Sequence, residues 1–207
     1  MHCRVVEGSI APDKFESGLQ TLKSTVLPAM KDLPGIAGAY WLGDRKSGKT
    51  LAATFYDTED ALVASRAQAE ALRTSGADSA GIKFTGVKEF EVIAKTGDKV
   101  STTATNARVT STQMEPSKVD DAVKAITGTI IPAAGQMSGF AGGVWLAERS
   151  TGMGIALTLW DSENAVAQSR ATTDELRQRT VSQLGGQILD VSEYEITARA
   201  ETPVRTG

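Results

Sequence analysis

Residues 33–42 read LPGIAGAYWL, and residues 137–146, which lie 104 positions further along the chain, read MSGFAGGVWL. The two stretches share a glycine, an Ala-Gly pair and a Trp-Leu pair at the same spacing. A match that recurs at a fixed offset is typical of an internal duplication. The sequence therefore predicts two copies of one fold.

The match continues outward from these stretches without a gap. Pairs of identical residues at the same offset extend toward both ends of the chain; they include Arg4 and Arg108, Pro28 and Pro132, Arg45 and Arg149, Asp57 and Asp161, Ser65 and Ser169, Arg66 and Arg170, and Glu89 and Glu193. The duplication also permits an internal comparison, because a residue kept in both copies is expected to have the same structural or functional role in each.

The hydrophobic pattern within each copy changes period in a fixed order. In the first copy, residues 4–10, 36–42, 50–56 and 82–93 favour strands, whereas the segments that follow Asp13 and Thr58 have apolar residues at helical spacing. Thr58 and Ser162 are suited to cap the second helix of each copy. Pro28 and Pro132 are expected to kink or break the first helix.

The predicted order is therefore β-α-β-β-α-β, twice. This is the ferredoxin-like α+β arrangement, in which both helices cover one face of an antiparallel sheet. The strands remain rich in apolar residues, so the other face of each sheet must also be buried. Stacking the two sheets into an eight-stranded barrel is the simplest solution.

Domain boundaries follow from the repeat. We expect a first repeat at 1–94, a polar linker at 95–106, a second repeat at 107–198 and a tail at 199–207. The linker contains almost no large apolar side chains, as is usual for connecting segments.

Composition restricts the partners and the compartment. The 207 residues are 41% hydrophobic and carry a net charge of −3, which predicts neither a nucleic-acid partner nor a membrane surface. The single cysteine, Cys3, excludes an internal disulfide and fits a reducing compartment. Because no signal peptide or transmembrane run is apparent, we expect a soluble cytoplasmic protein.

With this order established, the chain resembles the antibiotic biosynthesis monooxygenase (ABM) family of the dimeric α/β-barrel superfamily. The resemblance is carried by residues 33–42 and 137–146, by TFYDTEDA at 54–61 and by TLWDSENA at 158–165. Members are usually one copy long and form homodimers. The resemblance therefore implies a dimeric-type α/β barrel made within one chain as an intramolecular pseudo-dimer, with further homo-oligomers left open.

The same resemblance implies three functions. The first is a monooxygenase of small aromatic, polyketide-like substrates that uses no cofactor and no metal. The second is a non-catalytic module that binds a small ligand or serves assembly. The third, more distant, is a haem-binding protein; the haem-degrading relatives use a histidine to hold iron, whereas the only histidine here is His2.

The resemblance assigns the candidate catalytic residues. Oxygenases of the family place a tryptophan at the end of the third strand, where this chain has Trp160 and, in the first copy, Tyr56. A core aromatic is the alternative for both. The asparagine and tyrosine that the polyketide oxygenases carry nearby are replaced, by Ala52 and Leu62 in the first copy and by Ala156 and Val166 in the second, which favours the non-catalytic module. Trp41 and Trp145 occur in both copies, which indicates a shared packing role.

Charged residues on the first and last strands are the candidate substrate-binding residues: Arg4, Arg108, Glu89 and Glu193. Carboxylates at positions i and i+2, such as Glu89 and Glu91, share one face of a strand and could act on a polar ligand. The alternative is that they pair with the arginines or lie at an exposed rim. Two surface ion pairs are also expected at i, i+4 on the second helices, Arg66 with Glu70 and Arg170 with Asp174.

Residues 43–50, GDRKSGKT, match the P-loop pattern letter for letter. A working P-loop needs a following helix, whereas residues 51–56 favour a strand and the second copy lacks the lysine. The sequence predicts a β-hairpin turn instead. His2 and Cys3 have no metal-ligand spacing, so no metal site is predicted.

Overall fold

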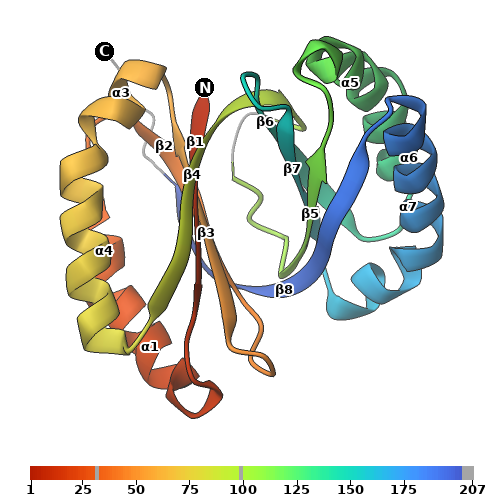
Figure 1. The fold of residues 1–207 in the computed structure, drawn as a ribbon. Coiled ribbons are helices and arrows are strands. Elements are labelled where there is room, and N and C mark those ends of the chain that lie inside the picture. Colours follow the sequence, from red (N-terminus) through yellow and green to blue (C-terminus); the bar gives the residue numbers. More distant parts are fainter. Residues whose placement is uncertain (31–32, 98–99, 202–207) are drawn as a thin grey trace. The chain divides into compact units, whose positions relative to one another are not determined.

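The computed structural model describes residues 1–30, 33–97 and 100–201 (Figure 1). The chain forms two compact units. Unit 1 comprises Met1–Glu89 and Ile196–Gly207, and unit 2 comprises Phe90–Glu195.

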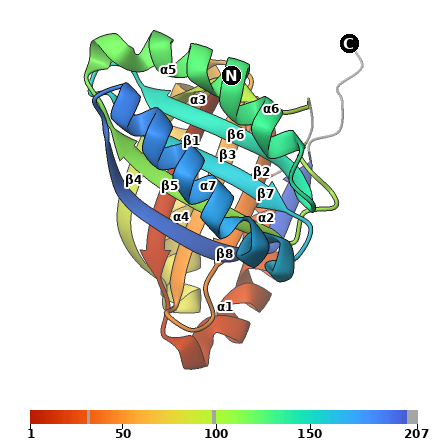
Figure 2. The same ribbon diagram turned by 90° about the vertical axis from the view of Figure 1, so that its right-hand side faces the viewer.

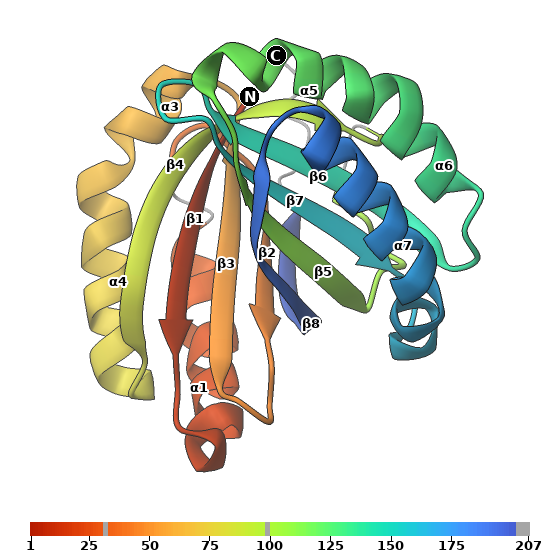
Figure 3. The ribbon, with the colours of Figure 1, turned by 45° about the vertical axis from the view of Figure 1, so that its right-hand side comes forward.

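In unit 1, strands β1 (His2–Ser9) and β2 (Ile36–Gly43) both pair antiparallel with β3 (Lys49–Tyr56). The helices lie on one side of these strands, and the start of β4 lies beside β1 (Figures 1 and 3). They are α1 (Phe15–Thr21), α2 (Leu27–Met30), α3 (Glu59–Ala64) and α4 (Arg66–Ala80), and β4 spans Lys83–Lys95.

In unit 2, β5 (Asn106–Gln113) and β6 (Phe140–Glu148) pair antiparallel with β7 (Met153–Trp160), and β8 (Gln187–Glu201) pairs with β5. Helices α5 (Val119–Ala125), α6 (Ile131–Gly135) and α7 (Glu163–Gln183) cover one face of these strands (Figure 2). The first strands begin at residues 2 and 106 and the third strands at 49 and 153, so the elements keep the offset of 104 residues.

Hydrogen bonding joins the strands in the closed order β1-β3-β2-β8-β5-β7-β6-β4. The predicted α+β class, an antiparallel eight-stranded barrel with helices, is thereby confirmed. The boundaries between the two compact units fall after Glu89 and after Glu195, which lie inside β4 and β8. Beyond these points Glu91 pairs with Ala147 of β6, and Thr197 donates its hydroxyl to the Trp41 carbonyl at 3.1 Å.

The ends of the predicted linker and the start of the predicted tail are strand residues. Lys95 ends β4, Asn106 begins β5, and β8 continues to Glu201. Residues 98 and 99 of that linker and 202–207 of that tail lie outside the described part of the chain.

The predicted helix caps are confirmed. The Thr58 hydroxyl accepts a hydrogen bond from Ala61 N at 3.1 Å, and the Ser162 hydroxyl accepts one from Ala165 N at 3.2 Å. Each cap satisfies a backbone N–H that a helix start leaves without a partner.

The predicted break at each proline takes the form of a π-helical turn. Leu22–Val26 and Ile126–Ile130 each end two residues before Pro28 or Pro132. Proline cannot donate a hydrogen bond to the carbonyl four residues earlier. The wider turn before it accommodates this missing bond by hydrogen bonds that span five residues, such as the one from Leu27 N to Leu22 O. Such turns are frequent at functional sites, and both border a cavity described below.

The stretch that matches the P-loop pattern is a hairpin turn, as predicted. Asp44 N donates to Lys49 O at 2.9 Å, and β3 follows directly. Gly48 has a φ of +73°, and a Cβ there would lie 1.9 Å from Ile10 O. Only glycine fits this turn without strain.

Within residues 1–30, 33–97 and 100–201, no helix has both the length and the apolar character needed to cross a membrane.

Candidate functional site

Unit 1 contains a buried arginine whose five N–H donors are all used. Arg4 is 2% exposed. Its Nη1 donates to Tyr56 Oη at 2.9 Å and to Ser65 Oγ at 3.0 Å, and its Nη2 donates to Leu62 O at 2.8 Å. Nε and Nη2 both donate to Glu89 Oε1, at 3.0 and 2.8 Å. Since a guanidinium has five donors and stays charged, no donor remains for a ligand.

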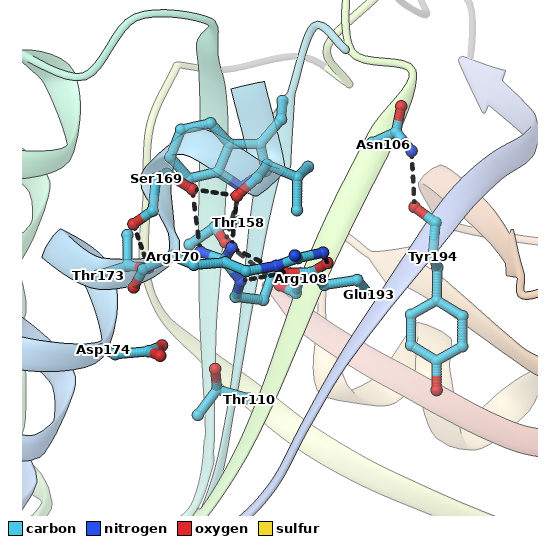
Figure 4. Close-up of polar contacts among 12 residues, drawn as sticks. Asn106, Arg108, Thr110, Thr158, Ser169, Arg170, Thr173, Asp174, Glu193 and Tyr194 are labelled. Atoms are coloured by element: carbon cyan, nitrogen blue, oxygen red, sulfur yellow. Dashed lines mark hydrogen bonds and ion pairs between the residues drawn. The ribbon is translucent and has the colours of Figure 1, made fainter. Parts of the chain in front are cut away.

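Unit 2 repeats this network around Arg108, with one partner exchanged (Figure 4). Arg108 donates to Ser169 Oγ at 3.1 Å, to Val166 O at 2.7 Å, and twice to Glu193 Oε1 at 3.1 and 2.8 Å. Its fifth donor goes to Thr173 Oγ1 at 2.6 Å. The arginine–carboxylate pairing considered as an alternative from the sequence is therefore present in both units.

The exchanged partner follows from the residue at the end of the third strand. The phenol oxygen of Tyr56 can accept from Arg4, whereas the indole N–H of Trp160, at the same position in unit 2, is a donor only. Thr173 supplies the missing acceptor, and its counterpart in unit 1 is Ala69. The matched donor of the buried arginine thus finds its acceptor in a tyrosine in unit 1 and in a threonine in unit 2.

Each strand carboxylate also binds an arginine from the helix. Arg66 Nη2 lies 2.6 Å from Glu89 Oε2, and Arg170 Nη2 lies 2.6 Å from Glu193 Oε2. Hydrogen bonds from Arg170, and then from Arg108, lower the pKa of Glu193. Burial alone would raise the pKa of Glu89, but the two arginines outweigh burial and lower it.

The predicted i, i+4 pairs on the helices are wrong. Arg66 and Arg170 bind the strand carboxylates rather than Glu70 and Asp174. The strand carboxylates are already ordered by the buried arginines, so pairing with them costs less side-chain entropy than ordering an exposed residue on the helix.

A largely apolar cavity of about 150 Å³ lies between the helices and the sheet of unit 1, partly open to solvent. Its wall combines a few polar groups with aliphatic and aromatic side chains from both layers. The polar lining includes Arg4, Thr54, Tyr56 and Arg73, and the apolar lining includes Val6, Leu22, Val26, Trp41, Ala52 and Leu72.

The equivalent cavity of unit 2 has a volume of about 130 Å³. Arg108 and Thr158 line it, whereas Trp160 is not among the described lining residues. Trp160 is 0% exposed, donates its indole N–H to Thr158 Oγ1 at 3.3 Å and meets the Phe140 ring edge-on at 5.6 Å. Trp145, like Trp41 in unit 1, lines its cavity.

The structure brings the sequence candidates together in two sets. Arg4, Tyr56 and Glu89 meet in unit 1, and Arg108, Trp160 and Glu193 meet in unit 2, where the guanidinium carbon lies 5.8 Å from the Trp160 ring. The roles of Ser65, Ser169 and Thr173 as acceptors for the buried arginines were not predicted from the sequence. One signal was available, since the serine that precedes each helix arginine is kept in both copies.

The free Cys3 thiol is buried, and this burial raises its pKa far above the ordinary value, so the thiol stays neutral. In the described residues, no group of three or more His, Cys, Asp or Glu side chains is placed to hold a metal ion.

Comparison with known proteins supports the fold. No protein-family model matches the chain. Two uncharacterised proteins of Mycobacterium tuberculosis strain H37Rv, Rv2557 and Rv2558, are each 26% identical to it, over 88% and 89% of this chain and 81% and 78% of their own lengths.

Solved structures match almost the whole chain. A candidate monooxygenase from Fusobacterium nucleatum has a TM-score of 0.68 at 13% identity and covers 97% of this chain and 94% of its own. An anthrone oxidase-like protein has a TM-score of 0.66 at 16% identity, over 96% and 92%. A heme-degrading enzyme from Listeria monocytogenes has a TM-score of 0.54 at 8% identity, over 94% and 99%. At these identities the likeness establishes the fold, which is the ABM-like α/β barrel that the sequence resemblance predicted.

Proposed function

We propose that the chain is a monooxygenase that oxidises a small electron-rich phenol with O₂, and that the reaction takes place in the unit 1 cavity at Tyr56. The named structural neighbours that are monooxygenase candidates or anthrone oxidase-like support the reaction class. The choice of cavity rests on one observation, the Arg4–Tyr56 hydrogen bond at a cavity wall.

This hydrogen bond directs the hydroxyl. Because Arg4 can only donate, Tyr56 Oη is the acceptor, and its own proton remains available. No acceptor for that proton is found among the described residues. Tyr56 can therefore donate to an oxygen of a bound substrate, and Arg4 acts as a positioning residue behind it. Negative charge that develops on that oxygen is stabilised by a preorganised donor in an apolar site.

The size of the cavity limits the substrate. An apolar protein cavity of about 150 Å³ holds a benzene-sized molecule, which is close to the volume in unit 1. The buried part of the substrate is then one aromatic ring, with substituents toward the open side.

The overall reaction balances without another reactant: a phenol with a free para position and O₂ give a quinone and water. One oxygen atom becomes the second quinone oxygen, and the other leaves with two hydrogens as water. The four electrons that O₂ takes up come from the ring. The two hydrogens of that water are the phenol proton and the hydrogen of the para carbon.

The test is oxygen consumption with a panel of mono- and dihydroxy-aromatics, with quinone formation followed by absorbance. Tyr56→Phe is expected to lower the rate about 100-fold. Trp160→Phe, at the matched position, is expected to keep it within about twofold. Loss of turnover in Trp160→Phe but not in Tyr56→Phe would place the reaction in unit 2 and contradict the proposal.

A second candidate is a non-catalytic module that binds a small aromatic ligand. It is favoured by the wall of the unit 1 cavity, whose described lining residues include no carboxylate and no imidazole that could serve as a base. Ligand binding without oxygen uptake for any phenol in the panel would decide for this candidate.

A further inference from the structure

A second arginine lines each cavity, and its surroundings differ between the units. Arg73 on α4 and Arg177 on α7 are matched positions. In unit 2, Arg177 Nη1 donates to Thr110 Oγ1 at 3.0 Å, and its Nη2 forms an ion pair with Asp174. This guanidinium is held by its own unit.

Arg73 has no such partners among the described residues. Thr110 is replaced in unit 1 by Val6, which has no acceptor, and no hydrogen bond or ion pair of the Arg73 guanidinium occurs within the described residues. The matched acid Glu70 does not pair with it, and Glu89 is already occupied by Arg4 and Arg66. A half-buried cation thus borders an apolar cavity without a counter-ion from the part of the chain that the structure describes.

The electrostatic surroundings agree with this geometry. Burial lowers the pKa of Arg73, and the positive charge of Arg4 lowers it further, while Glu70, Tyr56 and Glu89 act in the opposite direction. An arginine remains charged in proteins, so the unpaired guanidinium costs free energy that an anionic ligand would recover.

We propose that the ligand of the unit 1 cavity carries a carboxylate that Arg73 binds, so that its class is an aromatic acid. The ring occupies the apolar part of the cavity, and the guanidinium offers the planar, two-donor geometry that suits a carboxylate. The unit 2 cavity is not expected to prefer a carboxylate, because the Arg177 guanidinium already binds Asp174 and Thr110. The inference rests on the proposal that the unit 1 cavity takes a small aromatic ligand.

The experiment is calorimetric titration of the full chain with 3-phenylpropanoate and its neutral analogue 3-phenylpropanol. Neither probe is a phenol, so binding is measured apart from turnover. Wild type is expected to bind the acid at least about tenfold more tightly than the alcohol, which is the range for a charge-assisted hydrogen bond. Added salt is expected to weaken binding of the acid only.

Two matched variants locate the effect. Arg73→Gln is expected to abolish the preference for the acid and to keep or slightly raise thermal stability, since it removes a half-buried charge that has no partner among the described residues. Arg177→Gln is expected to keep the preference and to lower thermal stability. Val6→Thr supplies the hydroxyl that Thr110 provides in unit 2. This variant is expected to reduce the ratio of affinities for the acid and the alcohol without changing the affinity for the alcohol.

Equal affinity of wild type for the two probes, a preference that survives Arg73→Gln, or absence of binding by both would overturn the assignment. An intact preference in a protein that consumes no oxygen with any phenol would instead refute the oxygenase and leave the carboxylate site standing.

Discussion

Arg4 Nη2 and Glu89 Oε1 lie 2.8 Å apart, and the arginine side chain is 3% exposed while the glutamate side chain is 24% exposed. This pair lies between the sheet and the helices of unit 1, where removing the cation leaves several acceptors without a donor. The outer arginine of the same cluster, Arg66, is 59% exposed. The two arginines touch one carboxylate but differ in their energetic importance.

Arg4→Met is therefore expected to lower the free energy of unfolding by about 3 kcal/mol, because Glu89, Ser65 and the Leu62 carbonyl lose their donor. Arg66→Met is expected to cause a far smaller loss, since solvent screens an exposed pair. Urea denaturation followed by circular dichroism measures both. Similar losses for the two variants would show that burial does not govern this cluster.

Stability is expected to fall with acid through the two strand carboxylates. The pKa values of Glu89 and Glu193 lie below the ordinary value of 4.5, so the unfolded chain binds more protons than the folded one in this range. The contribution of these two carboxylates to the free energy of unfolding is complete above pH 4.5 and is lost as the pH falls through their pKa values in the folded chain. Comparing urea unfolding at pH 7 and at about pH 3.5 measures the loss.

The control for this pH dependence is the double variant Glu89→Gln/Glu193→Gln, which is expected to be less stable at pH 7 and to depend less on pH. Asp44 and Asp121, whose pKa values are also lowered, are present in both proteins and provide a common background. An unchanged slope in the double variant would assign the acid sensitivity to other groups.

The compensation between Trp160 and Thr173 predicts energetic coupling. Thr173→Ala removes the acceptor for one Arg108 donor and is expected to cost about 1–3 kcal/mol. Trp160→Tyr in the same chain places a phenol oxygen where Tyr56 lies in unit 1, and is expected to restore about 1 kcal/mol of that loss. A double-mutant cycle by urea denaturation measures the coupling. Strict additivity would mean that the two positions do not share the arginine.

Two glycines offer a matched test of the backbone. Gly48→Ala is expected to cost about 2 kcal/mol or more, because φ is +73° and the new Cβ would strike Ile10 O. Gly128→Ala, in the π-helical turn with nothing within 4 Å of its Cβ, is expected to gain about 0.5 kcal/mol. Thermal unfolding measures both, and a tolerated Gly48→Ala would argue against the hairpin geometry.

Much of the fold could be predicted from the sequence because its signals are local or repeated. The 104-residue offset carried the strand–helix order, and the hydroxyl residues Thr58 and Ser162 marked the helix starts. The rejection of a P-loop at residues 43–50 depended on recognising a strand after the motif, and β3 is that strand. Periodicity could not predict that the prolines would be accommodated by π turns.

The site was less predictable because its hydrogen-bond partners are distant in sequence. Which side chains pair depends on which of them the fold brings within reach. Proximity along the helix favoured Arg66 with Glu70, yet Glu89, already held by Arg4, takes that arginine. The unpaired state of Arg73 follows from the change of Thr110 to Val6, two strand positions whose contact with the helix only the fold reveals. The sequence does not distinguish Tyr56 from Trp160 as a cavity residue, whereas the fold places Tyr56 in the lining of the unit 1 cavity and does not place Trp160 in the described lining of the unit 2 cavity.

The most direct measurement of the central claim is a crystal structure of the protein with 3-hydroxyphenylacetate, a phenol with a free para position, bound in the absence of oxygen. The ring is expected in the unit 1 cavity, with the phenol oxygen within hydrogen-bond distance of Tyr56 Oη and the carboxylate on the Arg73 guanidinium. Density for the ligand in the unit 2 cavity alone, or outside both cavities, would contradict the account.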